Sequence, residues 1–150
     1  MVYKCAIIGC GRIGCGFDDN SKLIRTHAGA YYNNPKTVLN ALCDIDKTKL
    51  SKYGKKYGVT NLYTDYKQML RKEKPELISI CTLVDTHHNI VSEAIKNSVR
   101  GIFLEKPVAN SLSNAKKINN LCQKNNTVLL YLLVCINVHC IYIIIISCLY

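Results

Sequence analysis

The sequence lacks a secretory signal, a Cys-x-x-Cys pair and any charged residue after Lys124. Its N-terminal apolar run is too short for a signal peptide and leads directly into a glycine cluster, which excludes secretion and favours the cytoplasm. Nine cysteines without paired spacing support neither a zinc site nor a disulfide framework. We therefore expect reduced thiols that pack as small apolar side chains, and no bound metal.

The basic excess does not indicate a nucleic-acid surface. The formal net charge is +10, from 20 Lys and Arg against 10 Asp and Glu. The lysines are spaced as on solvated helix faces, and no basic run is interleaved with aromatic residues. This pattern favours small anionic ligands, including phosphorylated cofactors, over nucleic acid.

Length and composition indicate one globular domain. A chain of 150 residues with 49% hydrophobic and 20% charged residues is neither disordered nor of low complexity, and it leaves little room for a second full domain. Apolar strand-like segments alternate with helix-like segments, which predicts an α/β domain of Rossmann type, doubly wound around a mostly parallel sheet. The strands are expected at 3–8, 37–43, 61–63, 77–81, 101–104 and from Thr127, and the helices at 45–57, 66–72, 87–97 and after Ser111.

A glycine-rich motif follows the first expected strand. Residues 9–14 read Gly9-Cys10-Gly11-Arg12-Ile13-Gly14, a G-x-G-x-x-G match. In this context the first glycine makes a tight turn, the second lets backbone approach a pyrophosphate, and the third permits close packing of a helix on the sheet. The N-terminus of a helix that follows would supply N–H groups to the phosphates. The motif predicts dinucleotide binding.

An acidic residue ends the second strand. Asp44 stands where a carboxylate hydrogen-bonds the adenosine ribose, which favours NAD, with NADP as the other possibility because Lys47 and Lys49 lie nearby. Asp44 follows Gly14 by 30 residues instead of about 20, so an inserted surface loop is expected within residues 16–27. Asp46 is expected to cap the next helix.

A candidate catalytic group lies after the fifth strand. Glu105-Lys106-Pro107 occupies the carboxyl end of that strand, where ligands bind in doubly wound sheets. A lysine at this position can hydrogen-bond a substrate hydroxyl and favour its deprotonation, although a surface lysine on a turn is an equal alternative.

Four motifs in order resemble the Gfo/Idh/MocA oxidoreductases, a family of NAD(P)-dependent sugar and cyclitol dehydrogenases. They are Gly9 to Gly14, Cys43-Asp44-Ile45-Asp46, Ile80-Cys81-Thr82 with Asp85-Thr86-His87, and Glu105-Lys106-Pro107-Val108-Ala109. The resemblance implies that Lys106 is the catalytic lysine, that its bond to Pro107 is cis, that Glu105 orders the nicotinamide side, and that Thr82 and His87 lie near the cofactor. In the family pattern a proline follows the threonine, whereas here Leu83 does. His87 otherwise simply packs at the start of a helix.

The resembled family has a second domain that binds substrate and forms most of the oligomer interface. We expect residues 1–130 to form the cofactor domain and the substrate domain to be absent from this chain. Partners are then a nicotinamide dinucleotide and, only if a second domain is supplied, a sugar or small polyol. The oligomeric state is left open.

Residues 131–150 form an uncharged apolar tail with three possible explanations. It is long enough, counted from Val128, to span a bilayer as a helix; it could pair as a strand; or it could follow a frameshift or premature stop. The abrupt end of the family-like pattern favours the third explanation over the membrane span. Two functions follow: the NAD-binding part of an oxidoreductase that acts on CH–OH groups, or a truncated, inactive dinucleotide-binding module.

Overall fold

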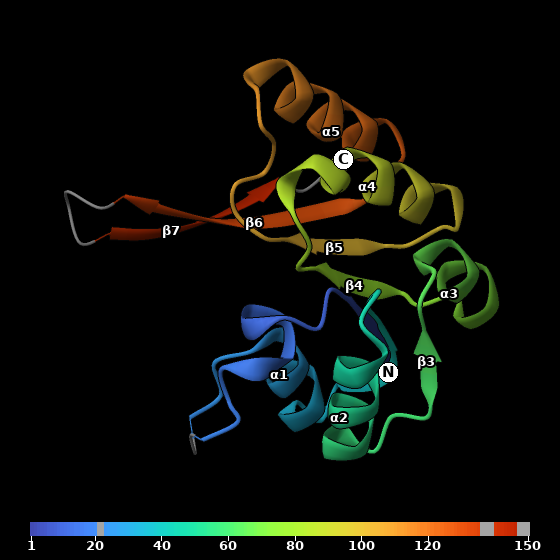
Figure 1. Ribbon diagram of the computed structural model, residues 1–150. Coiled ribbons are helices and arrows are strands. Elements are labelled where there is room, and N and C mark those ends of the chain that lie inside the picture. Colours follow the sequence, from blue (N-terminus) through green and yellow to red (C-terminus); the bar gives the residue numbers. More distant parts are fainter. Residues whose placement is uncertain (21–22, 136–139, 147–150) are drawn as a thin grey trace.

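The computed structural model describes residues 1–20, 23–135 and 140–146 and contains one seven-stranded sheet between two layers of helices (Figure 1). The strand order is β3-β2-β1-β4-β5-β6-β7; the first six strands are parallel and β7 runs antiparallel to β6. This arrangement confirms the predicted fold class. The strands are β1 (Tyr3–Ile8), β2 (Thr37–Cys43), β3 (Asn61–Tyr63), β4 (Leu77–Ile80), β5 (Gly101–Leu104), β6 (Val128–Cys135) and β7 (Cys140–Ile146). The helices are α1 (His27–Asn33), α2 (Lys47–Tyr57), α3 (Tyr66–Glu73), α4 (His87–Lys96) and α5 (Leu112–Lys124), with short turns η1 (Arg12–Gly16) and η2 (Val84–Thr86).

Local capping chemistry sets several helix ends where the sequence predicts them. The Asp46 side chain accepts the backbone N–H groups of Thr48 and Lys49 and begins α2, and Ser111 caps α5 in the same way. Gly58 ends α2 with φ of 66°, a left-handed conformation that glycine adopts without the steric cost of a Cβ.

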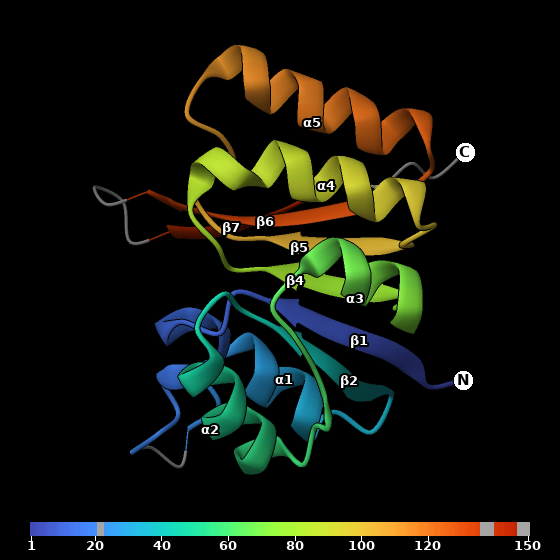
Figure 2. The same ribbon diagram turned by 45° about the vertical axis from the view of Figure 1, so that its right-hand side comes forward.

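Helices cover both faces of the sheet (Figure 2), and each face buries a separate core. Along β1, Ala6 and Ile8 point to the face covered by α3, α4 and α5, whereas Ile7 points to the face covered by α1 and α2. All three side chains are at most 2% exposed. A central parallel strand buried on both faces reads as a continuous apolar run, which is why β1 is recognisable in the sequence.

A bulge in β2 was not visible in the sequence. Cys5 pairs with Leu39 but Ala6 pairs with Ala41, so Asn40 is an extra residue in β2. As a result Leu39 and Leu42, three residues apart, pack into the same core. The Asn40 side chain donates to Glu73 Oε2 at 2.7 Å, which satisfies its amide beside α3.

The segment after the glycine motif differs from the expectation of a helix. Only the five-residue turn η1 follows directly, and the next helix, α1, begins at His27. The inserted loop is expected within residues 16–27, but Gly16 belongs to η1 and His27 already belongs to α1. No helix is expected at α1 from the sequence, although a threonine such as Thr26 is a common helix N-cap. The Thr26 hydroxyl accepts the Gly29 N–H at 3.0 Å.

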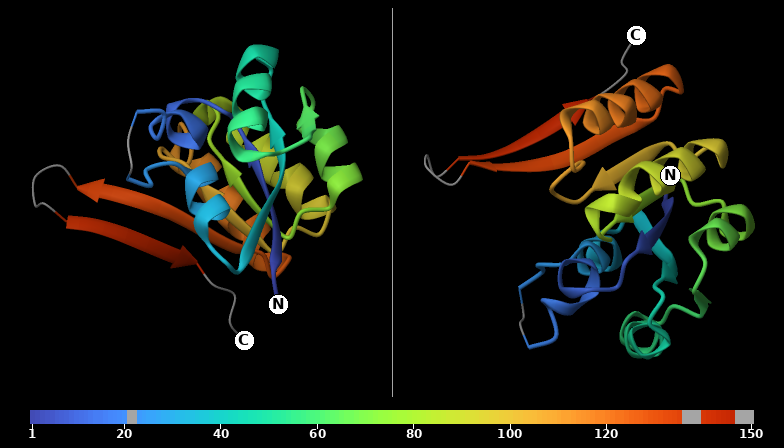
Figure 3. Two further views of the ribbon diagram at one scale, coloured as in Figure 1. Left: turned by 90° about the horizontal axis from the view of Figure 1, so that it is seen from below. Right: turned by 45° about the horizontal axis from the view of Figure 1, so that its top comes forward.

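The described part of the tail is β-structure. β6 continues to Cys135 and pairs along its length with β7, and this hairpin projects beyond the rest of the sheet (Figure 3). Among the helices of the described residues, none has the length and apolar character needed to cross a bilayer. Residues 136–139 and 147–150 of the tail lie outside the described part of the chain.

Candidate functional site

The glycine motif begins in the turn after β1, continues into η1 and packs against the residues that follow β4. Gly9 has φ of 99°, and a Cβ on it would lie 2.5 Å from the Cys81 carbonyl oxygen. A Cβ on Gly14 would overlap the Gly9 carbonyl oxygen. Gly11 differs, because a Cβ there would meet no atom within 4 Å. Gly9 and Gly14 therefore serve packing within the protein, whereas Gly11 keeps a space next to the backbone open.

The η1 turn holds the remaining residues of the motif. The N–H groups of Cys15 and Gly16 both bond the Gly11 carbonyl, at 2.9 and 3.1 Å. The exposed guanidinium of Arg12 lies over the Phe17 ring, 4.6 Å from its centroid. Ile13 is partly buried behind the turn.

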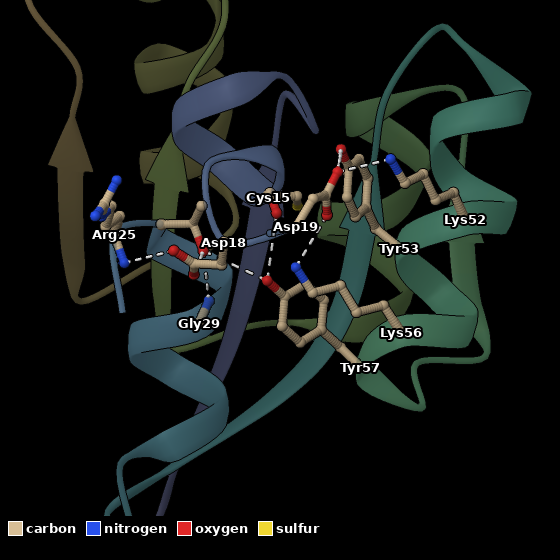
Figure 4. Close-up of polar contacts among 10 residues, drawn as sticks. Cys15, Asp18, Asp19, Arg25, Gly29, Lys52, Tyr53, Lys56 and Tyr57 are labelled. Carbon is tan, nitrogen blue, oxygen red and sulfur yellow. Dashed lines mark hydrogen bonds and ion pairs between the residues drawn. The ribbon is translucent and has the colours of Figure 1, made fainter. Parts of the chain in front are cut away.

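Two aspartates of the inserted segment fix it to the helices on either side (Figure 4). Asp18 accepts the backbone N–H of Arg25 at 2.6 Å and also bonds the Thr26 hydroxyl, so it holds the start of α1.

Asp19 binds α2 instead. Its carboxylate contacts Lys52 Nζ at 2.6 Å, Lys56 Nζ at 3.0 Å and the Tyr53 hydroxyl at 3.2 Å (Figure 4). These bonds, led by the one from Lys52, lower the pKa of Asp19. On the next turn of α2, the Tyr57 hydroxyl donates to the Cys15 carbonyl oxygen at 3.3 Å. Side chains of α2 therefore bind both η1 and Asp19 in the segment that follows it.

Asp44 lies at the carboxyl end of β2 and faces the glycine turn. Its Oδ2 accepts the Cys10 N–H at 2.6 Å and its Oδ1 accepts the Asp46 N–H at 2.9 Å. Each carboxylate oxygen has a second lone pair available for another donor. Asp44 is thereby held in one orientation beside Gly9 and Gly11.

A pocket of about 410 Å³ opens between the ends of β1, β2 and β4, which is where the strand order reverses direction. It brings together four of the predicted site residues, Gly9, Gly11, Asp44 and Thr82. The remaining lining includes Ile8, Cys43, Ile45, Lys49, Thr64, Tyr66, Cys81, Leu83, Thr86 and Ile90. Burial raises the pKa of the Cys43 thiol to about 12, and it raises that of Cys81 as well, so both act as apolar lining.

The other predicted residues lie beside this pocket and not in its lining. His87 is fully buried, with Nε2 3.2 Å from the Thr82 carbonyl oxygen and Nδ1 3.2 Å from that of Val108. It therefore joins the turn after β4 to the segment after Pro107, in addition to starting α4.

Glu105 and Lys106 follow β5. Glu105 is 8% exposed, whereas Lys106 is exposed, and the Lys106–Pro107 peptide bond is cis, as the family resemblance implies. Glu105 Oε1 pairs with His27 Nε2 at 2.9 Å, and its Oε2 accepts the Lys106 N–H at 3.2 Å. The bond from His27, followed by the charge of that ring, lowers the pKa of Glu105 despite its burial. His27 is thus a residue of this site, although the sequence predicts it in a surface loop.

The strand order, the glycine turn and the placement of Asp44 define a dinucleotide-binding Rossmann domain. Residues 3–132 match the family described as "Oxidoreductase family, NAD-binding Rossmann fold", the Gfo/Idh/MocA family, and the chain belongs to it. No cluster of His, Cys, Asp or Glu suited to a metal ion occurs within the described residues.

Curated relatives and solved structures agree with this assignment. The chain is 31% identical over 112 residues to D-apiose dehydrogenase of Paraburkholderia graminis, which covers 75% of this chain and 28% of that protein. It is 26% identical to D-glucoside 3-dehydrogenase of Escherichia coli, over 85% of this chain and 34% of that protein. An Agrobacterium radiobacter oxidoreductase crystallised with NAD⁺, L-tartaric acid and magnesium superimposes with a TM-score of 0.72 and 25% identity, over 87% of this chain and 35% of that one. The chain thus spans about a third of the length of its relatives.

Proposed function

We propose that this chain is the cofactor-binding part of an NAD-dependent oxidoreductase that acts on a CH–OH group of a sugar, cyclitol or related polyol. The observation that carries the proposal is the pocket at the strand-order reversal, where Gly11 and the oriented Asp44 carboxylate face the same space. NAD suits these residues, because open backbone at Gly11 accommodates a pyrophosphate and a carboxylate accepts ribose hydroxyl donors. Asp44 would repel a 2′-phosphate, so NADP is the weaker ligand.

The substrate class rests on the relatives and on Lys106. The curated relatives named above are dehydrogenases of D-apiose and of D-glucosides. NAD, when bound, supplies the hydride acceptor. The Lys106 ammonium, exposed after β5, would hydrogen-bond the substrate hydroxyl and stabilise the developing alkoxide. Glu105 would order the turn on the nicotinamide side, and Thr82 and His87 would shape the turn after β4.

A second candidate is dinucleotide binding without turnover by the chain on its own. It is favoured by the share of the relatives that the chain spans, 28% and 34% of the two curated proteins above. In this proposal residues 1–130 form the binding domain and substrate contacts come from elsewhere.

The cytoplasm is the compartment we propose. Its support is that six cysteines are free thiols, as is usual for reducing surroundings: Cys5, Cys10, Cys15, Cys43, Cys81 and Cys122.

Calorimetric titration of the purified chain with NADH and NADPH tests cofactor binding. We expect saturable binding with NADH preferred, and absence of binding for both cofactors would contradict either candidate function. An assay of D-apiose and inositol oxidation with NAD⁺ then separates the two, because turnover by the chain alone excludes the binding-only function.

A further inference from the structure

A chain of buried polar side chains lies beneath the Glu105–Lys106 turn and joins three secondary structure elements. The Tyr31 hydroxyl on α1 lies 3.0 Å from Ser79 Oγ on β4; Ser79 Oγ lies 3.0 Å from His27 Nδ1; and His27 Nε2 lies 2.9 Å from Glu105 Oε1. Ser79 is fully buried, and the side chains of His27 and Glu105 are only 11% and 10% exposed. These four side chains are therefore hydrogen-bonded to one another inside the protein.

The contacts of the His27 ring show which of its nitrogens donates to Glu105 and what holds the ring in place. A carboxylate only accepts hydrogen bonds, so Nε2 must carry the hydrogen and donate it to Glu105. The single hydroxyl hydrogen of Ser79 is donated to the Tyr31 hydroxyl, so the Ser79 oxygen, with its lone pairs, faces Nδ1 at 3.0 Å. The ring also packs edge-on against Phe103, with centroids 4.6 Å apart, so it is held both by hydrogen bonds and by an aromatic neighbour.

Glu105 transmits this constraint to Lys106. One carboxylate oxygen is bound by His27, and the other accepts the backbone N–H of Lys106 at 3.2 Å. Without His27, a buried carboxylate would lose its strongest partner and would turn toward water or become protonated. In both cases the hydrogen bond from the Lys106 backbone N–H to this carboxylate would weaken.

We propose that His27 is a positioning residue, which through Glu105 fixes the backbone of Lys106 at the nicotinamide side of the cofactor site. The inference rests on the proposed function, because that function is what gives Lys106 and Glu105 their roles. The proposal adds His27 to the residues that act at this site. It also gives a role to the segment before α1, because Asp18 hydrogen-bonds Thr26, and Thr26 caps the helix that begins with His27.

Two histidine substitutions separate the bonds of the ring. In H27Q the side-chain amide reaches about as far as Nε2 and still donates to Glu105, whereas the shorter amide of H27N reaches only the Nδ1 position, beside Ser79. Two ligands distinguish the contribution of the nicotinamide from that of the rest of the cofactor. NADH contains both parts, and ADP-ribose lacks the nicotinamide. Affinities for both are measured by calorimetry on the full chain, with circular dichroism as the control for folding.

We expect H27N to weaken NADH binding about fivefold or more and to leave ADP-ribose affinity within twofold, and H27Q to restore most of the NADH affinity. The Lys106 amide should also exchange with solvent faster in H27N than in the parent chain. Equal weakening of both ligands, or unchanged NADH affinity and Lys106 exchange, would overturn the inference. If H27N does not fold, E105Q replaces it, since it removes the charge that His27 binds, and the same selective loss of NADH affinity is expected.

Failure of this inference is distinguishable from failure of the proposed function. If the parent chain binds neither NADH nor ADP-ribose, the proposed function fails. If it binds both and H27N behaves like the parent, the role of His27 alone is wrong.

Discussion

The Asp44 carboxylate accepts the backbone N–H of Cys10 at 2.6 Å, a bond between the end of β2 and the glycine turn after β1. The two residues are 34 positions apart in the sequence. The bond orients the carboxylate before any ligand arrives, and it leaves lone pairs directed to the pocket. Asp44 thereby combines a structural contact with the proposed ribose contact.

Removal of this carboxylate should weaken cofactor binding. Hydrogen bonds to a charged group contribute about 1.5–3 kcal/mol, so we expect D44A to raise the Kd for NADH at least tenfold by calorimetry. D46A is the matched control: it removes the cap of α2 and lowers the stability of the protein, but it should change NADH affinity less than twofold. Equal Kd values for D44A and the parent chain would contradict the proposed ribose contact.

Alanine at the first two motif glycines should have opposite effects. The G11A side chain enters open space, so the thermal midpoint should stay within about 2 °C while NADH binding is lost or greatly weakened. G9A forces a left-handed residue against the Cys81 carbonyl, and a destabilisation of about 2 kcal/mol or more is expected. Scanning calorimetry with and without NADH measures both. A strongly destabilised G11A would show that Gly11 serves the fold and not the ligand.

The Asp19 contacts should make stability depend on pH. Because Lys52 and its neighbours lower the pKa of Asp19 in the folded state, its stabilisation is complete above the ordinary carboxyl pKa and is lost as the pH falls through the lowered one. We expect D19N to lose about 1 kcal/mol at pH 7, a value suited to a partly exposed pair. Urea unfolding should show that this difference shrinks at the acid end, whereas a constant difference would mean that the charge of Asp19 is irrelevant.

Buried thiols should resist modification in the folded protein. Burial is the main cause that raises the pKa of Cys5 and of Cys43 to about 12, and the thiolate is the reactive form. We therefore expect slow alkylation by iodoacetamide at pH 8 and fast alkylation in urea, followed by peptide mapping at these two positions. Rapid labelling without urea would show that the sheet opens locally at β1 and β2.

The origin of residues 131–150 can also be tested. The frameshift origin proposed for residues 131–150 is tested by the nucleotide sequence after codon 130. A second reading frame that encodes a further domain would support it. An uninterrupted native frame through Tyr150 would contradict it and favour the β6–β7 hairpin as part of the native protein.

Local sequence was sufficient to predict most of the sheet and part of the site. The strands β1, β2, β3 and β5 have the predicted bounds. For β1 and β5 the physical reason is that a strand buried between helix layers must be apolar at nearly every position. The glycine motif and Asp44 are recognisable for a similar reason, since backbone approach and ribose contact admit few residue types.

The sequence by itself determined the alternation of strands and helices, the helix caps and the residues at the carboxyl ends of β1, β2 and β5. Only the tertiary structure decided that Asn40 bulges out of β2 and that His27, 78 residues before Glu105, pairs with its carboxylate. The physical reason is that a strand or a cap depends on neighbours along the chain, whereas a hydrogen bond between side chains distant in the sequence depends on which elements pack together. A histidine after a loop carries no local mark of the carboxylate that it meets.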